Sequence, residues 1–130
     1  MDSVAVLGTG LIGTSIAAAA ARIGCTVSGW DGDQDTTAAA AAIAGFRPSA
    51  TLEEAVEGAD LVVVCVPIGA IAAVAARALE AAPDAIVTDA GSVKANVVDE
   101  VASLVPASSR SRFVGGHPLG GSERSEPPMG

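Results

Sequence analysis

Short apolar runs alternate with longer, alanine-rich runs along the whole chain. Apolar runs that end at glycine, aspartate or proline are typical of buried strands, and they occur at residues 3–8, 26–31, 46–50, 61–67, 85–91 and 112–116. The segments between them predict helices, at residues 11–24, 35–45, 51–60, 68–82 and 92–105. The run "LVVVCVP" at 61–67 is apolar on both faces, which predicts a central parallel strand covered by helices.

Local signals place some of the helix ends. Asp35 or Thr36 is the expected N-cap of the second helix, and Gly45 is its expected stop. Thr51 is followed three residues later by Glu54, which is the spacing of a capping box. Repeated strand–helix units of this kind predict an α/β fold of Rossmann type: a doubly wound, mostly parallel sheet in a single domain with helices on both faces.

Composition narrows the class of protein. A chain of 130 residues is long enough for one domain, and its formal net charge of −8 argues against a surface for nucleic acid. Residues 3–21 carry no charge, but glycines interrupt the run and Asp2 precedes it, so we expect neither a membrane span nor a signal peptide. We expect Cys25 and Cys65 to be small buried residues of a cytoplasmic protein, and we expect no metal site.

The turn after the first predicted strand carries the clearest chemical signal. It reads "GTGLIG", with Gly8, Gly10 and Gly13 in G-x-G-x-x-G spacing between a strand and a helix. In a dinucleotide site the first glycine permits the tight turn, the second admits the pyrophosphate, and the third lets helix and strand pack closely. The whole turn is therefore expected to bind the cofactor, including its other members Thr9, Leu11 and Ile12. A purely structural glycine turn is the alternative.

Two further positions bear on the cofactor. Asp31 ends the second predicted strand, where a carboxylate accepts hydrogen bonds from the adenine ribose and repels a 2′-phosphate. We therefore expect NAD rather than NADP. Val66 and Pro67 follow the central strand, and their backbone is expected to contact the cofactor, although Pro67 in a structural role would only end the strand.

Polar groups gather after the last two predicted strands, in "TDAGSVK" and "GGHPLGGSE". These segments supply the hydroxyl of Ser92, the ammonium group of Lys94 and the imidazole of His117 at the same edge of the sheet. Removal of hydride from an alcohol carbon needs an acceptor for the hydroxyl proton, a role that suits the only histidine of the chain. The alternatives are that His117 caps a turn and that Lys94 is a solvated helix residue.

Three segments, in order, resemble the prephenate and arogenate dehydrogenases of tyrosine biosynthesis: "VAVLGTGLIGTSIA", "TDAGSVK" and "FVGGHPLGGSE". The resemblance implies NAD(P)-dependent oxidative decarboxylation of a cyclohexadienol. It also implies that His117 accepts the proton of the ring hydroxyl and that Ser92 hydrogen-bonds near that hydroxyl and the nicotinamide. Lys94 is a candidate contact to the substrate without a defined role. Leu119 and Gly120 depart from the methionine and larger neighbour that the family usually has after "HP".

The family also carries a helical C-terminal domain that forms the dimer and supplies basic residues for the substrate carboxylates. We therefore expect residues 1–121 to be the dinucleotide-binding domain and the polar tail at 122–130 to begin a connection to such a domain. Two other interpretations remain open. The chain is alternatively the NAD-binding domain of a β-hydroxyacid dehydrogenase or imine reductase relative, or a non-catalytic NAD-binding module.

Overall fold

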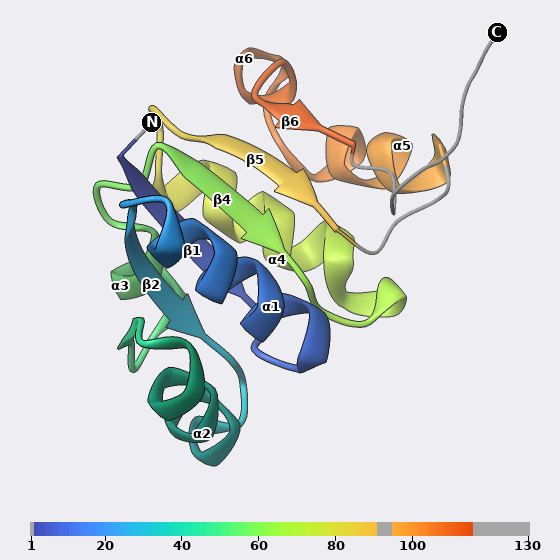
Figure 1. Ribbon diagram of the computed structural model, residues 1–130. Coiled ribbons are helices and arrows are strands. Elements are labelled where there is room, and N and C mark those ends of the chain that lie inside the picture. The colour runs from blue at the N-terminus through green and yellow to red at the C-terminus, as the bar shows by residue number, and fades with distance from the viewer. Residues whose placement is uncertain (1, 91–94, 116–130) are drawn as a thin grey trace, which may run out of the picture.

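In the part of the chain that the structure describes, six parallel strands form one sheet at the centre of the molecule (Figure 1). The computed structural model describes residues 2–90 and 95–115. The strands lie in the order β3-β2-β1-β4-β5-β6, so the chain starts in the middle, runs to one edge and then returns to build the other half. Their bounds are β1 Ser3–Leu7, β2 Thr26–Trp30, β3 Arg47–Pro48, β4 Leu61–Val64, β5 Ile86–Asp89 and β6 Phe113–Val114. This order is that of a Rossmann dinucleotide-binding fold, as the alternating pattern predicts.

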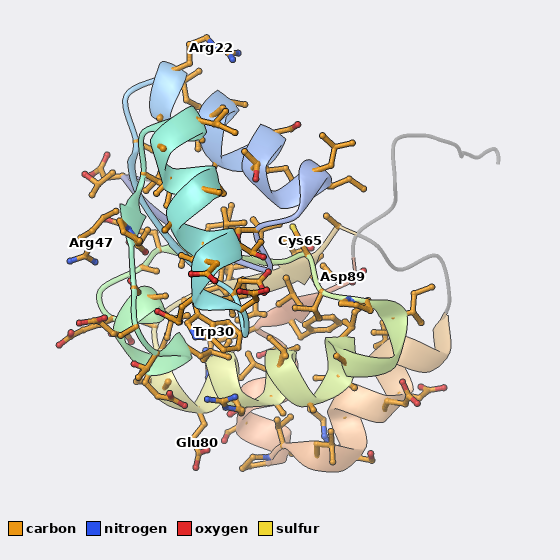
Figure 2. The ribbon with its side chains drawn as sticks, turned by 90° about the horizontal axis from the view of Figure 1, so that it is seen from below. Arg22, Trp30, Arg47, Cys65, Glu80 and Asp89 are labelled. Carbon is orange, nitrogen blue, oxygen red and sulfur yellow. The ribbon has the colours of Figure 1, made fainter. Side chains whose placement is uncertain are left out.

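Helices cover both faces of the sheet, which gives three layers (Figure 2). One face carries α1 (Leu11–Arg22) and α2 (Gln34–Ala44), which pack on each other and on the strands. The other carries α3 (Leu52–Val56), α4 (Ile68–Ala81) and α5 (Ala95–Leu104), followed by the short α6 (Ala107–Arg110). The crossover through α3 therefore changes faces, which puts a topological switch point between β1 and β4.

The core is divided by the sheet into two layers. Successive residues of β4 point to opposite faces, so Val62 and Val64 enter the larger cluster and Val63 enters the smaller one. The larger layer packs against α4 through Ile71 and Leu79, both of which are fully buried. The smaller layer is built on alanines of α1 and α2 around Phe46. Close packing of alanine explains how a chain with three aromatic residues fills two layers.

The structure confirms the predicted strands and helices but corrects several ends. The second helix begins one residue before Asp35, because Asp33 is its N-cap and accepts the N–H groups of Asp35 and Thr36. The central strand ends at Val64, before the proline, and the turn that follows belongs to the site described below. Helix α6 was not predicted.

Other predicted ends are confirmed. Gly45 closes α2 at a φ of 79°, in the left-handed region that favours glycine. Thr51 caps α3 by accepting the N–H of Glu54 at 3.1 Å. In the described part of the chain, no helix is long and apolar enough to cross a membrane.

Candidate functional site

The glycine turn is held between two strands and a helix. Gly8 has a φ of 102°, and a Cβ there would lie 2.6 Å from the carbonyl oxygen of Cys65. A Cβ on Gly13 would overlap the carbonyl oxygen of Gly8, so α1 can approach β1 only with glycine at this position. Gly10 is different, because it is exposed and a Cβ there would meet no atom within 4 Å. Two of the glycines therefore build the turn, and Gly10 leaves open space beside it.

Helix α1 presents its positive end at this open space. Gly10 is its N-cap, no side chain caps the helix there, and its first turn contains no acidic residue. The first N–H groups of an α-helix have no acceptor within the helix. Together with the helix dipole, such groups form an anion site suited to the pyrophosphate of a dinucleotide.

Asp31 lies at the end of β2 with its carboxylate held on both oxygens. Oδ2 accepts the N–H of Thr9 at 2.8 Å, and Oδ1 accepts the N–H of Asp33 at 3.0 Å. The carboxylate therefore has a fixed orientation beside the glycine turn, with lone pairs left for other donors. Thr9, which was predicted to bind the cofactor, is itself buried and donates its N–H to Asp31.

A groove of about 650 Å³ joins these groups. Its lining includes Gly8 and Gly10 of the glycine turn, together with Asp31, Gly32 and Thr36. The remaining lining residues form an apolar wall: the predicted residues Val66 and Pro67, and four that the sequence patterns did not identify, Trp30, Cys65, Ala70 and Val74. A polar rim with an apolar wall suits an adenosine with a pyrophosphate, so these residues fit a dinucleotide.

Trp30 is a groove residue that its position in the sequence could have identified. It directly precedes Asp31 at the strand end, and it is the only tryptophan of the chain. The guanidinium of Arg77 lies 5.9 Å from the centre of its ring and also pairs with Glu53 at 3.0 Å. Arg77 is therefore engaged away from the carboxylate of Asp31.

The edge of the sheet continues from the groove toward β5 and β6. Cys65 and Asp89 lie at the ends of neighbouring strands (Figure 2), and Asp89 is 2% exposed. Burial, with a smaller contribution from the negative charge of Asp89, raises the pKa of the Cys65 thiol to about 11. Cys65 is therefore a neutral wall residue at physiological pH and no nucleophile.

The two segments predicted to carry the chemistry begin side by side. Thr88 is paired with Val114 across β5 and β6, and its hydroxyl donates to the carbonyl of Val114 at 2.6 Å. The predicted residues themselves, Ser92, Lys94 and His117, lie outside the described residues, so their roles stay predictions. Among the residues that the structure describes, no group of three or more His, Cys, Asp or Glu side chains could hold a metal ion.

Comparison with family models assigns this chain to a family. The model of the nucleotide-binding domain of prephenate dehydrogenase matches residues 16–130. The chain belongs to this family. The match confirms the resemblance seen in the motifs and supports this family rather than the β-hydroxyacid dehydrogenase and imine reductase relatives.

Individual relatives agree with the family assignment. The cyclohexadienyl dehydrogenase of Zymomonas mobilis is 37% identical over 98% of this chain and 44% of its own length. The solved prephenate dehydrogenase of Aquifex aeolicus, in complex with hydroxyphenyl propionate and NAD+, is 28% identical with a TM-score of 0.76, over 95% of this chain and 43% of that one. The arogenate dehydrogenase of Synechocystis is 30% identical with a TM-score of 0.77, over 92% and 42%. The chain thus spans less than half the length of these relatives.

Proposed function

We propose that this chain is the NAD-binding domain of a dehydrogenase that oxidatively decarboxylates prephenate or arogenate to the 4-hydroxyphenyl product of tyrosine biosynthesis. The observation that carries the proposal is the groove in which the open glycine turn, the uncapped end of α1 and the fixed carboxylate of Asp31 meet. A relative in complex with NAD+ and hydroxyphenyl propionate supports the same cofactor and a ring of the same kind.

The groove favours NAD over NADP. The carboxylate of Asp31 stands where the adenine ribose would lie, and Asp33 adds a second negative charge at the start of α2. A 2′-phosphate there would face both charges, and Arg77, which lies over the ring of the groove residue Trp30, is engaged by Glu53. The pyrophosphate would meet the N–H groups at the start of α1.

The cofactor supplies the hydride acceptor of the reaction. Hydride leaves the ring carbon that bears the hydroxyl and passes to the nicotinamide, and the hydroxyl proton passes to a base. The bond to the ring carboxylate then breaks to release carbon dioxide, its electron pair makes the ring aromatic, and a proton returns to the ring oxygen to give the 4-hydroxyphenyl product. We propose His117 as that base and Ser92 as the group that orients the ring hydroxyl, with Lys94 near the substrate. The family motifs "TDAGSVK" and "GGHPLGGSE", which start from the neighbouring strands β5 and β6, support this assignment.

Further parts of the whole protein belong to the same proposal. Residues 1–121 would form the dinucleotide-binding domain, and the tail at 122–130 would lead to a helical domain that completes the substrate site and forms a homodimer. A cytoplasmic location agrees with two cysteines, Cys25 and Cys65, that are not joined in a disulfide. We propose no nucleic-acid or membrane partner.

A titration of the chain with NAD and NADP tests the cofactor. Trp30 lines the groove and the chain has no tyrosine, so intrinsic fluorescence reports binding directly. We expect NAD to bind and NADP to bind more weakly, and we expect Asp31→Asn to weaken NAD by about tenfold through loss of two charge-assisted hydrogen bonds. Asp35→Asn is the control, because it makes the same change in net charge outside the groove. Tighter binding of NADP than of NAD would refute the role of Asp31.

An assay of the full-length gene product with prephenate and with arogenate tests the reaction. We expect His117→Asn to abolish NADH formation while NAD still binds. A retained rate in that variant would exclude a catalytic histidine. If the full-length protein binds NAD but converts neither substrate, the alternative of a non-catalytic NAD-binding module holds instead.

A further inference from the structure

The peptide before the open glycine is held by two contacts within the domain. Thr9 is buried, and its N–H is fixed by Asp31 Oδ2 at 2.8 Å. The carbonyl of Gly8, in the same peptide unit as that N–H, lies against Gly13 of α1. The peptide unit between Gly8 and Thr9 therefore cannot turn.

The next peptide unit is held by a residue that has no assigned role. The hydroxyl of Thr14 donates to the carbonyl oxygen of Thr9 at 3.0 Å, while the backbone N–H of Thr14 makes the first bond of α1 to Gly10. No cis peptide bond occurs in the described chain, so the N–H of Gly10 points opposite to the carbonyl of Thr9. By fixing that carbonyl, the hydroxyl of Thr14 also fixes the direction of the Gly10 N–H.

We propose that Thr14 is a positioning residue for the pyrophosphate-binding turn: its hydroxyl holds the Thr9–Gly10 peptide so that the N–H of Gly10 is oriented before the dinucleotide arrives. This inference rests on the proposed function. Gly10 borders the groove, carries no side chain to stabilise its own backbone and is exposed. Without the hydrogen bond from Thr14, the N–H of Gly10 would sample several directions. The affinity for the dinucleotide would then fall in proportion to the fraction of molecules in which this N–H points in the binding direction.

The neighbouring residue offers a matched control. Ser15 also donates its hydroxyl to a backbone carbonyl, that of Leu11, at 2.9 Å. Leu11 already lies inside α1, where the helix itself fixes the direction of the peptide. Thr9 precedes the helix, so its carbonyl depends on Thr14. Two hydroxyls with the same type of bond thus differ in whether the bond orients a group of the site.

The experiment compares Thr14→Val, Thr14→Ser and Ser15→Ala in the 130-residue chain. Valine keeps the shape of threonine and removes the hydroxyl, and serine keeps the hydroxyl. Each variant is titrated with NAD, with ADP-ribose, which contains the pyrophosphate, and with adenosine, which lacks it. Trp30 fluorescence follows binding, and thermal melts confirm that every variant is folded.

We expect Thr14→Val to weaken NAD and ADP-ribose by about two- to tenfold, the range of one hydrogen bond, and to leave adenosine unchanged. Thr14→Ser and Ser15→Ala should match the wild type. Unchanged affinity of Thr14→Val for ADP-ribose, or an equal loss for adenosine, would overturn the inference while leaving the proposed function intact. A wild-type chain that binds neither NAD nor ADP-ribose would refute both.

Discussion

Substitution of two glycines of the turn, Gly13 and Gly10, should affect folding and cofactor binding separately. Gly13→Ala places a methyl group in overlap with the carbonyl oxygen of Gly8 and 3.0 Å from its carbonyl carbon. Both partners are backbone, so no change of rotamer relieves the contact, and α1 must move away from β1. Gly10→Ala meets no atom within 4 Å, and its φ of −73° is open to any residue.

These geometries set opposite expectations. Overpacking of a rigid site costs up to about 3 kcal/mol, and the gain of helix propensity from glycine to alanine returns less than about 1 kcal/mol, so we expect Gly13→Ala to lose about 2 kcal/mol. For a domain of this size that corresponds to a fall in melting temperature of roughly 6–10 °C. Gly10→Ala should stay within about 1 kcal/mol of the wild type, since alanine is only a poorer N-cap than glycine. Its methyl group enters the groove, however, and should weaken NAD by about tenfold or more.

The assay is a thermal melt together with a titration by NAD for each variant. Gly69→Ala is the control, because Gly69 also lies in the first turn of a helix and a Cβ there would meet no atom within 4 Å. It should melt at or slightly above the wild-type temperature and bind NAD normally. If Gly13→Ala melts like Gly69→Ala, the close approach of α1 and β1 is wrong. If Gly10→Ala binds NAD with wild-type affinity, the open space beside Gly10 is not the path of the pyrophosphate.

Three further predictions concern groups outside the turn. With its pKa raised to about 11, about one Cys65 thiol in a thousand is ionised at pH 8. Alkylation of Cys65 by iodoacetamide, followed by mass spectrometry, should therefore be far slower in the native chain than after unfolding. Rapid labelling of Cys65 in the native chain would contradict the raised pKa. The guanidinium of Arg112 donates to three carbonyls at the end of α4 and in the turn after it. Arg112→Met should therefore lower the free energy of unfolding, measured by urea titration, by about 2–3 kcal/mol without changing the affinity for NAD. Weaker NAD binding at unchanged stability would refute a purely structural role of Arg112. The N–H groups of Asp2 and Ser3 lower the pKa of Asp60 below its ordinary value of 3.8, so its stabilising effect is present above that value and is lost as the pH falls through the lowered one. Asp60→Asn should therefore lower the melting temperature at pH 7, and this difference from the wild type should shrink as the pH is lowered into the acid range. A difference that does not change with pH would exclude the charge as the cause.

The sequence predicts the sheet well because the strands are buried on both faces. Residues 61–67 contain no polar side chain that could face solvent, so their pattern predicts a strand covered on both faces. In the structure, β4 lies at the centre of the sheet. The position at which such a strand ends is less determined. Cys65 is as apolar as Val64, but it already belongs to the turn that contacts Gly8. Apolar content therefore predicts the existence of an element better than its last residue.

The N-cap of α2 shows the same limit for polar residues. Asp33, Asp35 and Thr36 are all good caps within one turn, so propensity alone does not choose among them. The choice is made by Asp31, which accepts the N–H of Asp33 and so fixes where the chain leaves β2. The orientation of the Asp31 carboxylate depends in turn on the N–H of Thr9, which lies 22 residues earlier and reaches Asp31 only when the sheet is formed.

The site divides in the same way. The motif spacing was enough to select Gly8, Gly10, Gly13 and Asp31, since these residues act through backbone geometry and charge at fixed places in the fold. Part of the apolar wall comes from α4, through Ala70 and Val74, which look like any other core positions in the sequence. Thr14 was equally hidden, because a hydroxyl five residues after its acceptor becomes meaningful only once the turn is closed.

The described domain is therefore prepared for the cofactor more fully than for the substrate. Asp31 and the turn at Gly10 are fixed by bonds within the domain, whereas Arg77, whose guanidinium lies over the ring of the groove residue Trp30, is paired with Glu53. A substrate with carboxylate groups would meet a chain of net charge −8 with no described arginine free beside the groove. We therefore expect the 130-residue chain to bind NAD and to turn over prephenate poorly, and robust NADH formation by this chain alone would show that His117 and its neighbouring loops suffice for the substrate.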